Sequence, residues 1–455
     1  MSFSCVLIGQ ESLLVGCGEA LLEAGHEIRA VISPDPEIRA WARGKTIPQS
    51  ERIADLAEQF APGGFDWLLS IANLAVIPAE VLSLPANGAV NFHDGPLPDY
   101  AGLNTPVWAL LAGEGWHGVT WHVIEGGIDE GDILAQETVE IAGDETAFSL
   151  NSKCYAAAMD SFPEVMAQLE NGLERQAQDL SHRRYFARDD RPEGFARLDL
   201  HRPAEALARQ VRALDFGGYW NPLACAKLET SEGILRIGGA EPAGRSGALP
   251  GTVIEVAGNA LVVATGDGDL RLTGLTDLMG GQAEMPAKGS RLPGIEATEL
   301  EALSALQQRV AKREPLWRRA LQAHHALPVP LARKGEAGGW SAQRVSVPYG
   351  LDEAGLRAAA LVWALRGSGE EHGDVAVSTP ALQADAATGY VAPWVPVPVG
   401  IESTLADLAE AVATAAGRDA GFALDLIARD PAITAAGTPP VALALDGAGP
   451  VEGSV

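Results

Sequence analysis

The chain has 455 residues and a formal net charge of −27 at pH 7, with 33 Lys and Arg against 60 Asp and Glu. This excess of negative charge repels phosphate backbones and argues against a nucleic-acid partner. The length suits about two to four domains, and no run reaches the roughly 18 apolar residues of a membrane span. The 4 cysteines lack metal-ligand spacing and the N-terminus lacks a signal-peptide pattern, so we expect a cytoplasmic protein without a structural metal.

The N-terminal part of the chain alternates short apolar runs with amphipathic segments. This alternation predicts an α/β fold with a doubly wound parallel sheet. In such a sheet, ligands bind at the carboxyl ends of the strands. The expected strands are 4–9, 27–32, 67–71, 88–90, 119–124 and 135–141, and the expected helices are 11–24, near 55–58, 105–111 and 149–170.

The segment 91–134 carries most of the concentrated polar chemistry. The strand 88–90 is followed by Asn91, Phe92 and His93, and strand alternation places Asn91 and His93 on one face. A rigid loop must follow, because Pro96 and Pro98 each lack a backbone donor and have a fixed φ. Asp129 lies in a tight, glycine-rich loop, from which an acid can reach a histidine across the site.

These residues carry a family resemblance. The chain reads Asn-x-His, then Pro-x-Tyr-x-Gly, then an Asp 36 residues after the His within Gly-x-Asp-x-Gly-Asp-Ile. This set resembles the formyltransferases that use 10-formyltetrahydrofolate, which include methionyl-tRNA, glycinamide-ribonucleotide and aminosugar formyltransferases. The resemblance implies a Rossmann-like catalytic domain at 1–185 and assigns catalysis to Asn91, His93 and Asp129. Asn91 and a protonated His93 would be oxyanion donors, and Asp129 would orient the imidazole and relay the proton lost by the amine.

The same resemblance implies where the folate binds. The pterin would lie against main-chain groups of two loops, Ala75, Val76 and Ile77 in one and Glu125, Gly126, Gly127 and Ile128 in the other. The loop after the His commonly reads Gly-Ser-Leu-Leu-Pro in the family and Asp-Gly-Pro-Leu-Pro here, with expected folate contacts at Gly95, Leu97 and Pro98. No metal is implied. The nearby residues His117 and His122 are expected to be structural.

A charged, proline-containing linker at 183–194 leads to a second predicted domain, 200–298. A helix is expected at 202–214, followed by five short strands joined by glycine-rich turns, which suggest a small OB-like barrel. From His201 to Thr298 there are 9 Lys and Arg against 11 Asp and Glu, a net of −2, which is not an electrostatic footprint for tRNA. The expected strands are 223–228, 234–237, 251–256, 260–265 and 270–275.

Residues 299–339 are predicted to be a helical connector and linker, built on a helix at 296–325. Its basic stretch 309–319 is either a solvated face or a docking surface for an acidic partner. Residues 340–455 are predicted to form a further α/β unit, with strands at 344–347, 375–378 and 394–399 and helices at 352–365 and 404–416.

Within this last unit, 374–432 loosely resembles the C-terminal half of nonribosomal peptide synthetase condensation domains. The signature His-His-x-x-x-Asp-Gly is missing, because His324 and His325 are not followed by Asp-Gly. The resemblance therefore implies a partial, non-catalytic condensation-like domain. The end of the chain at 450–455 carries no terminating helix, which is consistent with an excised piece of a longer assembly-line protein.

The leading hypothesis is an initiating formyltransferase of a peptide synthetase. It would formylate the amine of an aminoacyl group that phosphopantetheine tethers to a carrier domain, with an adenylation domain adjacent and no nucleic-acid or membrane partner. One alternative is a free-standing formyltransferase acting on a small amine such as an aminosugar or hydroxyornithine. The other is a degenerate scaffold, against which the intact set of Asn91, His93 and Asp129 argues.

Overall fold

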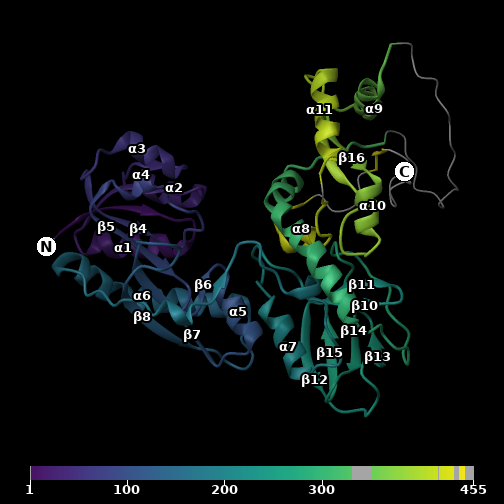
Figure 1. Ribbon diagram of the computed structural model, residues 1–455, viewed down its shortest axis with the longest axis horizontal. Coiled ribbons are helices and arrows are strands. Elements are labelled where there is room, and N and C mark those ends of the chain that lie inside the picture. Colours follow the sequence, from purple (N-terminus) through teal and green to yellow (C-terminus); the bar gives the residue numbers. More distant parts are fainter. Residues whose placement is uncertain (1, 330–349, 419, 435–439, 446–455) are drawn as a thin grey trace. The chain divides into compact units, whose positions relative to one another are not determined.

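The computed structural model describes residues 2–329, 350–418, 420–434 and 440–445 (Figure 1). The chain divides into two compact units, Met1–Arg188 and Asp189–Val455. Among the helices of the described ranges, none is long and apolar enough to cross a bilayer. The strand expected at 344–347 lies outside the described residues.

The first unit is built on a seven-stranded sheet with the order β3-β2-β1-β4-β5-β7-β8. The strands β1 to β5 run parallel to their neighbours, whereas β7 is antiparallel to β5, and β8 to β7. The sheet is therefore mostly parallel, and its last two strands depart from the prediction. The loop from β7 to β8 is too short for a parallel crossover, which explains the antiparallel pairing of these two strands. The strands are β1 (Ser4–Ile8), β2 (Glu27–Ile32), β3 (Gln49–Ser50), β4 (Phe65–Ser70), β5 (Pro85–His93), β7 (Trp116–Val123) and β8 (Ile133–Glu140).

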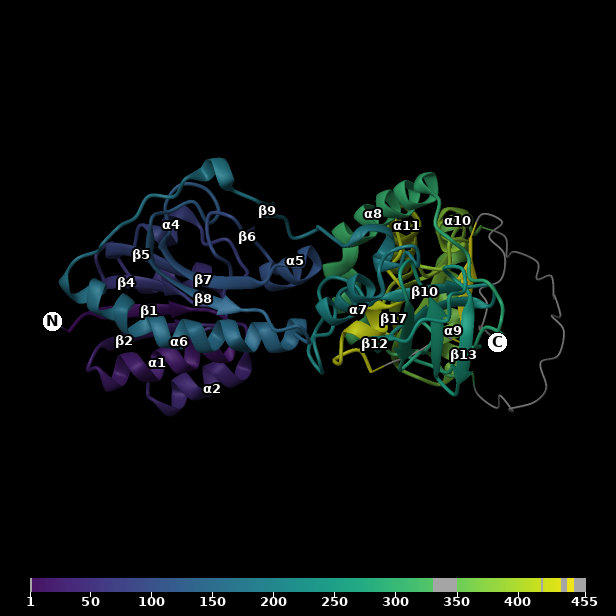
Figure 2. The ribbon, with the colours of Figure 1, turned by 90° about the horizontal axis from the view of Figure 1, so that it is seen from below.

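Helices cover both faces of this sheet (Figure 2). On one face, α1 (Ser12–Glu23) packs against the long α6 (Ala147–Asn171). On the other, α3 (Leu56–Gln59) and α4 (Ala79–Leu82) contribute Leu56 and Val81 to a core cluster with residues of β1, β2 and β4. The remaining elements of this unit are α2 (Pro36–Gly44), η1 (Ile53–Asp55), α5 (Thr105–Ala112), η2 (Leu180–His182), β6 (Ala101–Gly102) and β9 (Tyr185–Phe186).

The helix α2 was not predicted, although its start carries a recognisable signal. Asp35 caps it by accepting a hydrogen bond from the Glu37 N–H, and Pro36 occupies the first turn. Both features are typical of a helix N-terminus.

The second unit begins with η3 (Glu193–Ala196) and α7 (Ala204–Ala213). Its strands form a hairpin, β10-β11, and a four-stranded antiparallel sheet with the order β12-β15-β14-β13. The sheet includes β12, which was not predicted; the OB-like assignment stays a prediction. The strands are β10 (Lys227–Thr230), β11 (Gly233–Arg236), β12 (Gly239–Ala243), β13 (Val253–Ala257), β14 (Ala260–Ala264) and β15 (Asp269–Thr273).

The C-terminal part of the same unit has a three-stranded sheet, β17-β16-β18, against which two helices pack. The expected helices and strands at 352–365, 375–378, 394–399 and 404–416 are present, whereas α10, α12 and β18 were not predicted. The elements are α8 (Ala297–Gln322), α9 (Glu353–Ser368), β16 (His372–Ser378), α10 (Pro380–Ala386), β17 (Val395–Gly400), α11 (Leu405–Ala416), α12 (Leu426–Arg429) and β18 (Ala442–Ala444).

The long helix α8 is not a solvated connector. Its first half packs with Phe195 and Tyr390 in one core cluster, and Trp317 in its second half belongs to the core beneath β16 and β17. Two of the basic residues considered as a docking surface are paired within the protein: Arg309 lies 2.9 Å from Asp385, and Arg318 lies 2.6 Å from Asp430. Part of the basic charge of this helix is therefore paired with acids of the same unit.

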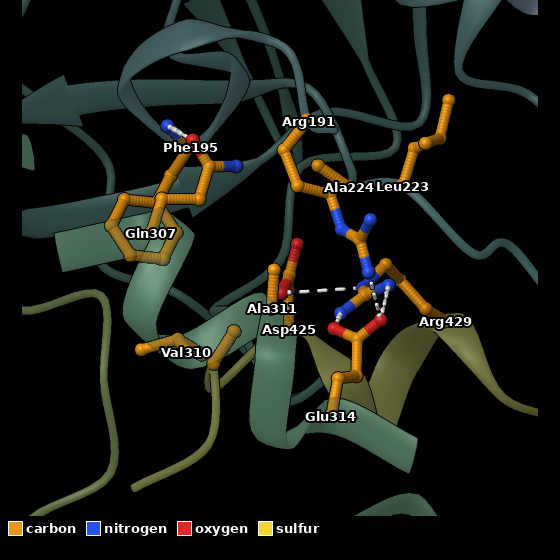
Figure 3. A pocket seen from close by; sticks show the side chains of 11 residues that line it. Arg191, Phe195, Leu223, Ala224, Gln307, Val310, Ala311, Glu314, Asp425 and Arg429 are labelled. Atoms are coloured by element: carbon orange, nitrogen blue, oxygen red, sulfur yellow. Dashed lines mark hydrogen bonds and ion pairs between the residues drawn. The ribbon is translucent and has the colours of Figure 1, made fainter. Parts of the chain in front are cut away.

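Buried charges join the 200–298 part of the second unit to its C-terminal part. Lys227 Nζ lies 2.6 Å from Asp425 Oδ2, and both side chains are almost fully buried. Nearby, Arg429 and Arg191 both point at Glu314 (Figure 3), and Arg191 lies 2.9 Å from its carboxylate. The segments predicted as separate domains at 200–298 and 340–455 thus share one interior in their described residues.

Candidate active site

The end of β5 supplies the first two residues of the site. Phe92 points to the α6 side of the sheet, where its ring lies 5.2 Å from Trp121 and 6.4 Å from Tyr155. Asn91 and His93 therefore lie on the opposite face, as the alternation predicts. His93 is buried, and its Nε2 donates to the Tyr100 carbonyl oxygen at 2.5 Å, which fixes the ring and leaves Nδ1 free to face other groups.

Asp129 reaches this face from the loop between β7 and β8. Its Oδ2 lies 3.7 Å from His93 Nδ1 and accepts a hydrogen bond of 2.8 Å from the Gly102 N–H. The first distance is longer than a hydrogen bond, so it is an ion-pair contact. The structure thus brings Asn91, His93 and Asp129 together; their roles stay predictions.

Asp129 is ionised in this setting. Burial disfavours its charge, but the neighbouring His93, His122 and the Gly102 N–H outweigh burial and hold the pKa of this carboxyl well below its ordinary value. A buried carboxylate that stays charged is suited to orienting an imidazole.

His122 belongs to the same cluster, although the sequence analysis assigned it a structural role. Its Nδ1 donates to the Val123 carbonyl oxygen at 2.8 Å, and its Nε2 lies 3.2 Å from Asn91 Nδ2. The same Nε2 lies 3.5 Å from Asp129 Oδ1. The pairing of β5 with β7 places His122 directly opposite Asn91. Only this register reveals the contact, because the sequence does not say which strand lies beside β5.

Asp94 is a second carboxyl at the site that the sequence analysis did not name. Its Oδ1 lies 3.9 Å from His93 Nδ1. Burial raises the pKa of Asp94, and the nearby His93 opposes this effect. The main-chain carbonyl of Asp94 accepts a hydrogen bond of 2.8 Å from His117 Nε2, and burial lowers the pKa of His117 to about 4. His117 is therefore a neutral structural residue, as expected.

The proline loop after His93 is held by side chains of β7 and β8. Thr120 Oγ1 donates to the Gly95 carbonyl at 2.7 Å and accepts from the Leu97 N–H at 3.2 Å, while Gln136 donates to the Leu97 carbonyl at 2.7 Å. The Leu97 side chain is buried against Ala101 and Ile133. The predicted folate contact at Leu97 is thus unfavourable, because its main chain and side chain are both used inside the protein.

A glycine is required at position 95. A Cβ there would lie 2.4 Å from the Tyr100 carbonyl oxygen and 2.7 Å from His93 Nε2. Gly95 therefore allows the close approach that lets Tyr100 hold the His93 imidazole. Pro98, the third residue expected to contact folate in this loop, is half-buried.

The two loops expected to hold the pterin expose apolar side chains. Val76 is 77% exposed and Ile128 is 48% exposed, and residues 125–127 between β7 and Ile128 are also exposed. Ile77, at the end of the first loop, and Ile124, just before the second, pack against the same core cluster. A flat heterocycle is bound by apolar walls with a few polar groups, so these residues fit a pterin.

One predicted main-chain contact is engaged elsewhere. The Ala75 N–H donates to Asn73 Oδ1 at 3.1 Å, and the Ala75 carbonyl accepts from Asn73 Nδ2 at 2.9 Å. In the other loop, the Glu125 carboxylate pairs with Arg175 at 3.0 Å. Ala75 thus stabilises the shape of its loop.

The pair His324-His325 lies outside this site. His324 Nδ1 bonds Asp374 Oδ2 at 2.9 Å, and the His324 side chain is 2% exposed. The Asp374 carboxylate also accepts a hydrogen bond of 2.7 Å from the His325 N–H. These contacts give His324 a structural role at the start of β16.

Comparison with known proteins assigns the chain to a family. Residues 24–166 match the formyl transferase family, and residues 193–288 match the formyl transferase C-terminal domain. Methionyl-tRNA formyltransferase from Thiobacillus denitrificans is 34% identical over 271 residues, which cover 56% of this chain and 85% of that protein. The enzyme of the same name from Lachnospira eligens is 28% identical over 288 residues, covering 58% of this chain and 89% of that protein.

Two solved structures are also similar. One is the N-formyltransferase from Helicobacter canadensis in complex with folinic acid and dTDP-3-aminofucose, with a TM-score of 0.49, 20% identity and coverage of 60% of this chain and 99% of that one. The other is HypX from Aquifex aeolicus in complex with tetrahydrofolic acid, with a TM-score of 0.45, 19% identity and coverage of 60% and 44%. From the family matches and the sequence identity to the Thiobacillus enzyme, the chain belongs to the formyl transferase family and is a folate-dependent formyltransferase.

Proposed function

We propose that this protein transfers the formyl group of 10-formyltetrahydrofolate to the amine of an aminoacyl group tethered by phosphopantetheine to a carrier domain. The observation that carries the chemistry is the cluster of Asn91, His93, His122 and Asp129, which combines hydrogen-bond donors with an ionised carboxylate on one face of β5. An intact cluster of this kind argues against a degenerate scaffold.

The bound folate supplies the formyl group on its N10. The transfer forms one C–N bond, breaks another, and requires one proton to move from the acceptor amine to N10. The Asn91 side-chain amide nitrogen carries two protons. One can point at His122 Nε2, 3.2 Å away, so the second is available as a donor to a developing oxyanion. His93 Nε2 is committed to the Tyr100 carbonyl, so Nδ1 of the protonated ring is the donor available to the developing oxyanion, while Asp129 orients the ring and relays the proton from the amine to N10.

Charge supports a carrier-tethered acceptor over tRNA, the acceptor in the names of the relatives. The chain has a net charge of −27, and the region His201–Thr298 has a net of −2. A tRNA would have to bring a polyanion against this field, whereas a phosphopantetheine arm is long and narrow and enters a cleft while its carrier stays outside. The resemblance of 374–432 to condensation domains, which act on carrier-tethered groups, points the same way.

The ion pairs of α8 bear on the candidate docking surface for the carrier domain, the basic stretch 309–319. Arg309 and Arg318 are paired with Asp385 and Asp430, so the exposed side chains of Lys312 and Arg319 are the better candidates within the stretch 309–319 for contact with an acidic carrier. The described residues of 340–455 are proposed to have a packing role without condensation activity, because the base motif is absent and His324 is buried. Amide-bond formation between two loaded carriers by this chain would refute that role.

A competition experiment tests the acceptor. The purified protein receives 10-formyltetrahydrofolate together with charged initiator tRNA and an aminoacyl-loaded carrier domain at moderate salt, and formyl transfer to each is measured. His93→Ala serves as the control for uncatalysed formylation. We expect faster formylation of the carrier-bound amine. Faster formylation of the tRNA would overturn the proposal, and a preference for a free amine such as an aminosugar or hydroxyornithine would replace it with a small-molecule acceptor.

A further inference from the structure

Residues 172–186, from the end of α6 through β9, contact the loop that carries Asp129 and hold its main chain. Gln176 exchanges two main-chain hydrogen bonds with Ile133, of 2.8 and 2.9 Å. Gln178 Nε2 donates to the carbonyl oxygens of Asp129, at 2.9 Å, and Gly131, at 2.6 Å. Arg183 donates to the Ile128 carbonyl at 2.8 Å. We refer to residues 172–186 as the crossing segment.

The crossing segment also positions β6, whose Gly102 N–H donates to the Asp129 carboxylate. Its end, β9, pairs in parallel with β6, where the Ala101 N–H bonds the Arg184 carbonyl and the Leu103 N–H bonds the Phe186 carbonyl, both at 2.9 Å. Between these two donors, the Gly102 N–H points the other way and bonds Asp129 Oδ2 at 2.8 Å. The same segment therefore contacts both the main chain of Asp129 and the strand that binds its carboxylate.

Asp129 needs such support because its backbone is in the left-handed region, with φ of 55°. A residue with a side chain holds that conformation when its surroundings fix it. The Gln178 side-chain amide donates to the carbonyl oxygens of Asp129 and Gly131. One amide group therefore bridges the two ends of this turn. Its Oε1 is buried and has no hydrogen-bond partner within the described chain, so the amide protons alone anchor the side chain.

We propose that Gln178 is a positioning residue for formyl transfer, which sets the Asp129 carboxylate against the His93 imidazole. This inference rests on the proposed role of Asp129. Gln178 contacts no reacting atom; it acts through the Asp129 and Gly131 carbonyls, and its loss lets the turn relax and the carboxylate move away from His93.

The first test compares Gln178→Met with Gln168→Met. Methionine keeps the length of the side chain and removes the amide donors. Gln168 is a matched control in the same unit, since its Nε2 donates to the Leu134 carbonyl at 2.8 Å and its Oε1 accepts from the Glu174 N–H at 3.0 Å. It therefore holds the start of the crossing segment without contacting the Asp129 turn, and it separates loss of the segment's general support from loss of the contact with that turn. We expect Gln178→Met to lower kcat by on the order of 10²-fold with little change in KM for the acceptor, because small displacements of catalytic groups have effects of this size. Gln168→Met is expected to keep wild-type kcat.

The second test repeats Gln178→Met in an Asp129→Asn background, where Asn also tolerates the left-handed backbone. There the Gln178 substitution is expected to have no further effect on kcat. Full activity of Asp129→Asn alone would reject the proposed role of Asp129. That result is distinguishable from wild-type activity of Gln178→Met, which would reject only the inference about Gln178.

Amide hydrogen exchange at Gly102 gives a readout without turnover. Exchange at this N–H is expected to speed up in Gln178→Met, because its acceptor Asp129 Oδ2 moves, and to stay unchanged in Gln168→Met. This measurement decides the question if Asp129→Asn abolishes turnover. Wild-type kcat in Gln178→Met, an equal loss in both backgrounds, or unchanged exchange at Gly102 would overturn the inference.

Discussion

The substitution Lys227→Met tests whether the second unit is held together by its buried charges. The Lys227 side chain is 1% exposed, and its Nζ lies 2.6 Å from Asp425 and 2.9 Å from the carbonyl oxygens of Phe195 and Cys225. Methionine has a similar volume, so the main cost is electrostatic: Asp425 remains buried with Arg429, whose Nε lies 3.3 Å away, as its ion-pair partner.

Removing one member of a buried ion pair typically costs about 3–5 kcal/mol. Because Arg429 still compensates part of the Asp425 charge, we expect a loss near the lower limit, about 3 kcal/mol. A matched control is Arg309→Met, which removes an ion pair whose Arg309 side chain is 47% exposed. Pairs of that kind contribute about 0–1 kcal/mol.

The assay is denaturant-dependent hydrogen exchange on the full chain, which reports each segment separately. If the charges join the two parts of the unit, β10 and β16 should lose protection together in Lys227→Met. The double variant Lys227→Met/Asp425→Leu should recover part of the loss, because it removes the uncompensated carboxylate. A loss below about 1 kcal/mol, or a loss confined to β10 while β16 keeps its protection, would refute the reasoning.

Three further predictions concern the active site. His93→Ala is expected to lower turnover on the order of 10²–10³-fold while the chain stays folded, and wild-type turnover with 10-formyltetrahydrofolate would refute the mechanism. The pKa of Asp129 is lowered in the folded state, so its ionisation stabilises the protein above its ordinary pKa and less as the pH falls. The gap in Tm between wild type and Asp129→Asn should therefore shrink below about pH 4; a gap that widens there would contradict this sign. Gly102→Ala would place a Cβ 2.1 Å from the Phe186 carbonyl at φ of 97°, so it should cost more than about 1 kcal/mol in thermal unfolding and reduce turnover, whereas Gly143→Ala, with open space around it, should change neither.

The sequence determined the features that depend on local pattern. Strand alternation placed Asn91 and His93 on the face opposite Phe92, and the ring contacts of Phe92 agree. The family resemblance, carried by the motifs and their spacing, pointed to Asp129 in its glycine-rich loop as the third residue. Apolar runs also predicted α5 and the parallel strands β1, β2, β4 and β5, because hydrophobic period and turn chemistry are encoded within a few residues.

Only the tertiary structure decided which distant residues meet. His122 joined the site through the register of β5 with β7, and Gln178 through the path of residues 172–186. Lys227 and Asp425 are 198 positions apart, and the burial of α8 depends on the two cores that it joins. Such contacts depend on which faces pack together, and local preference carries no information about a partner far away in the chain.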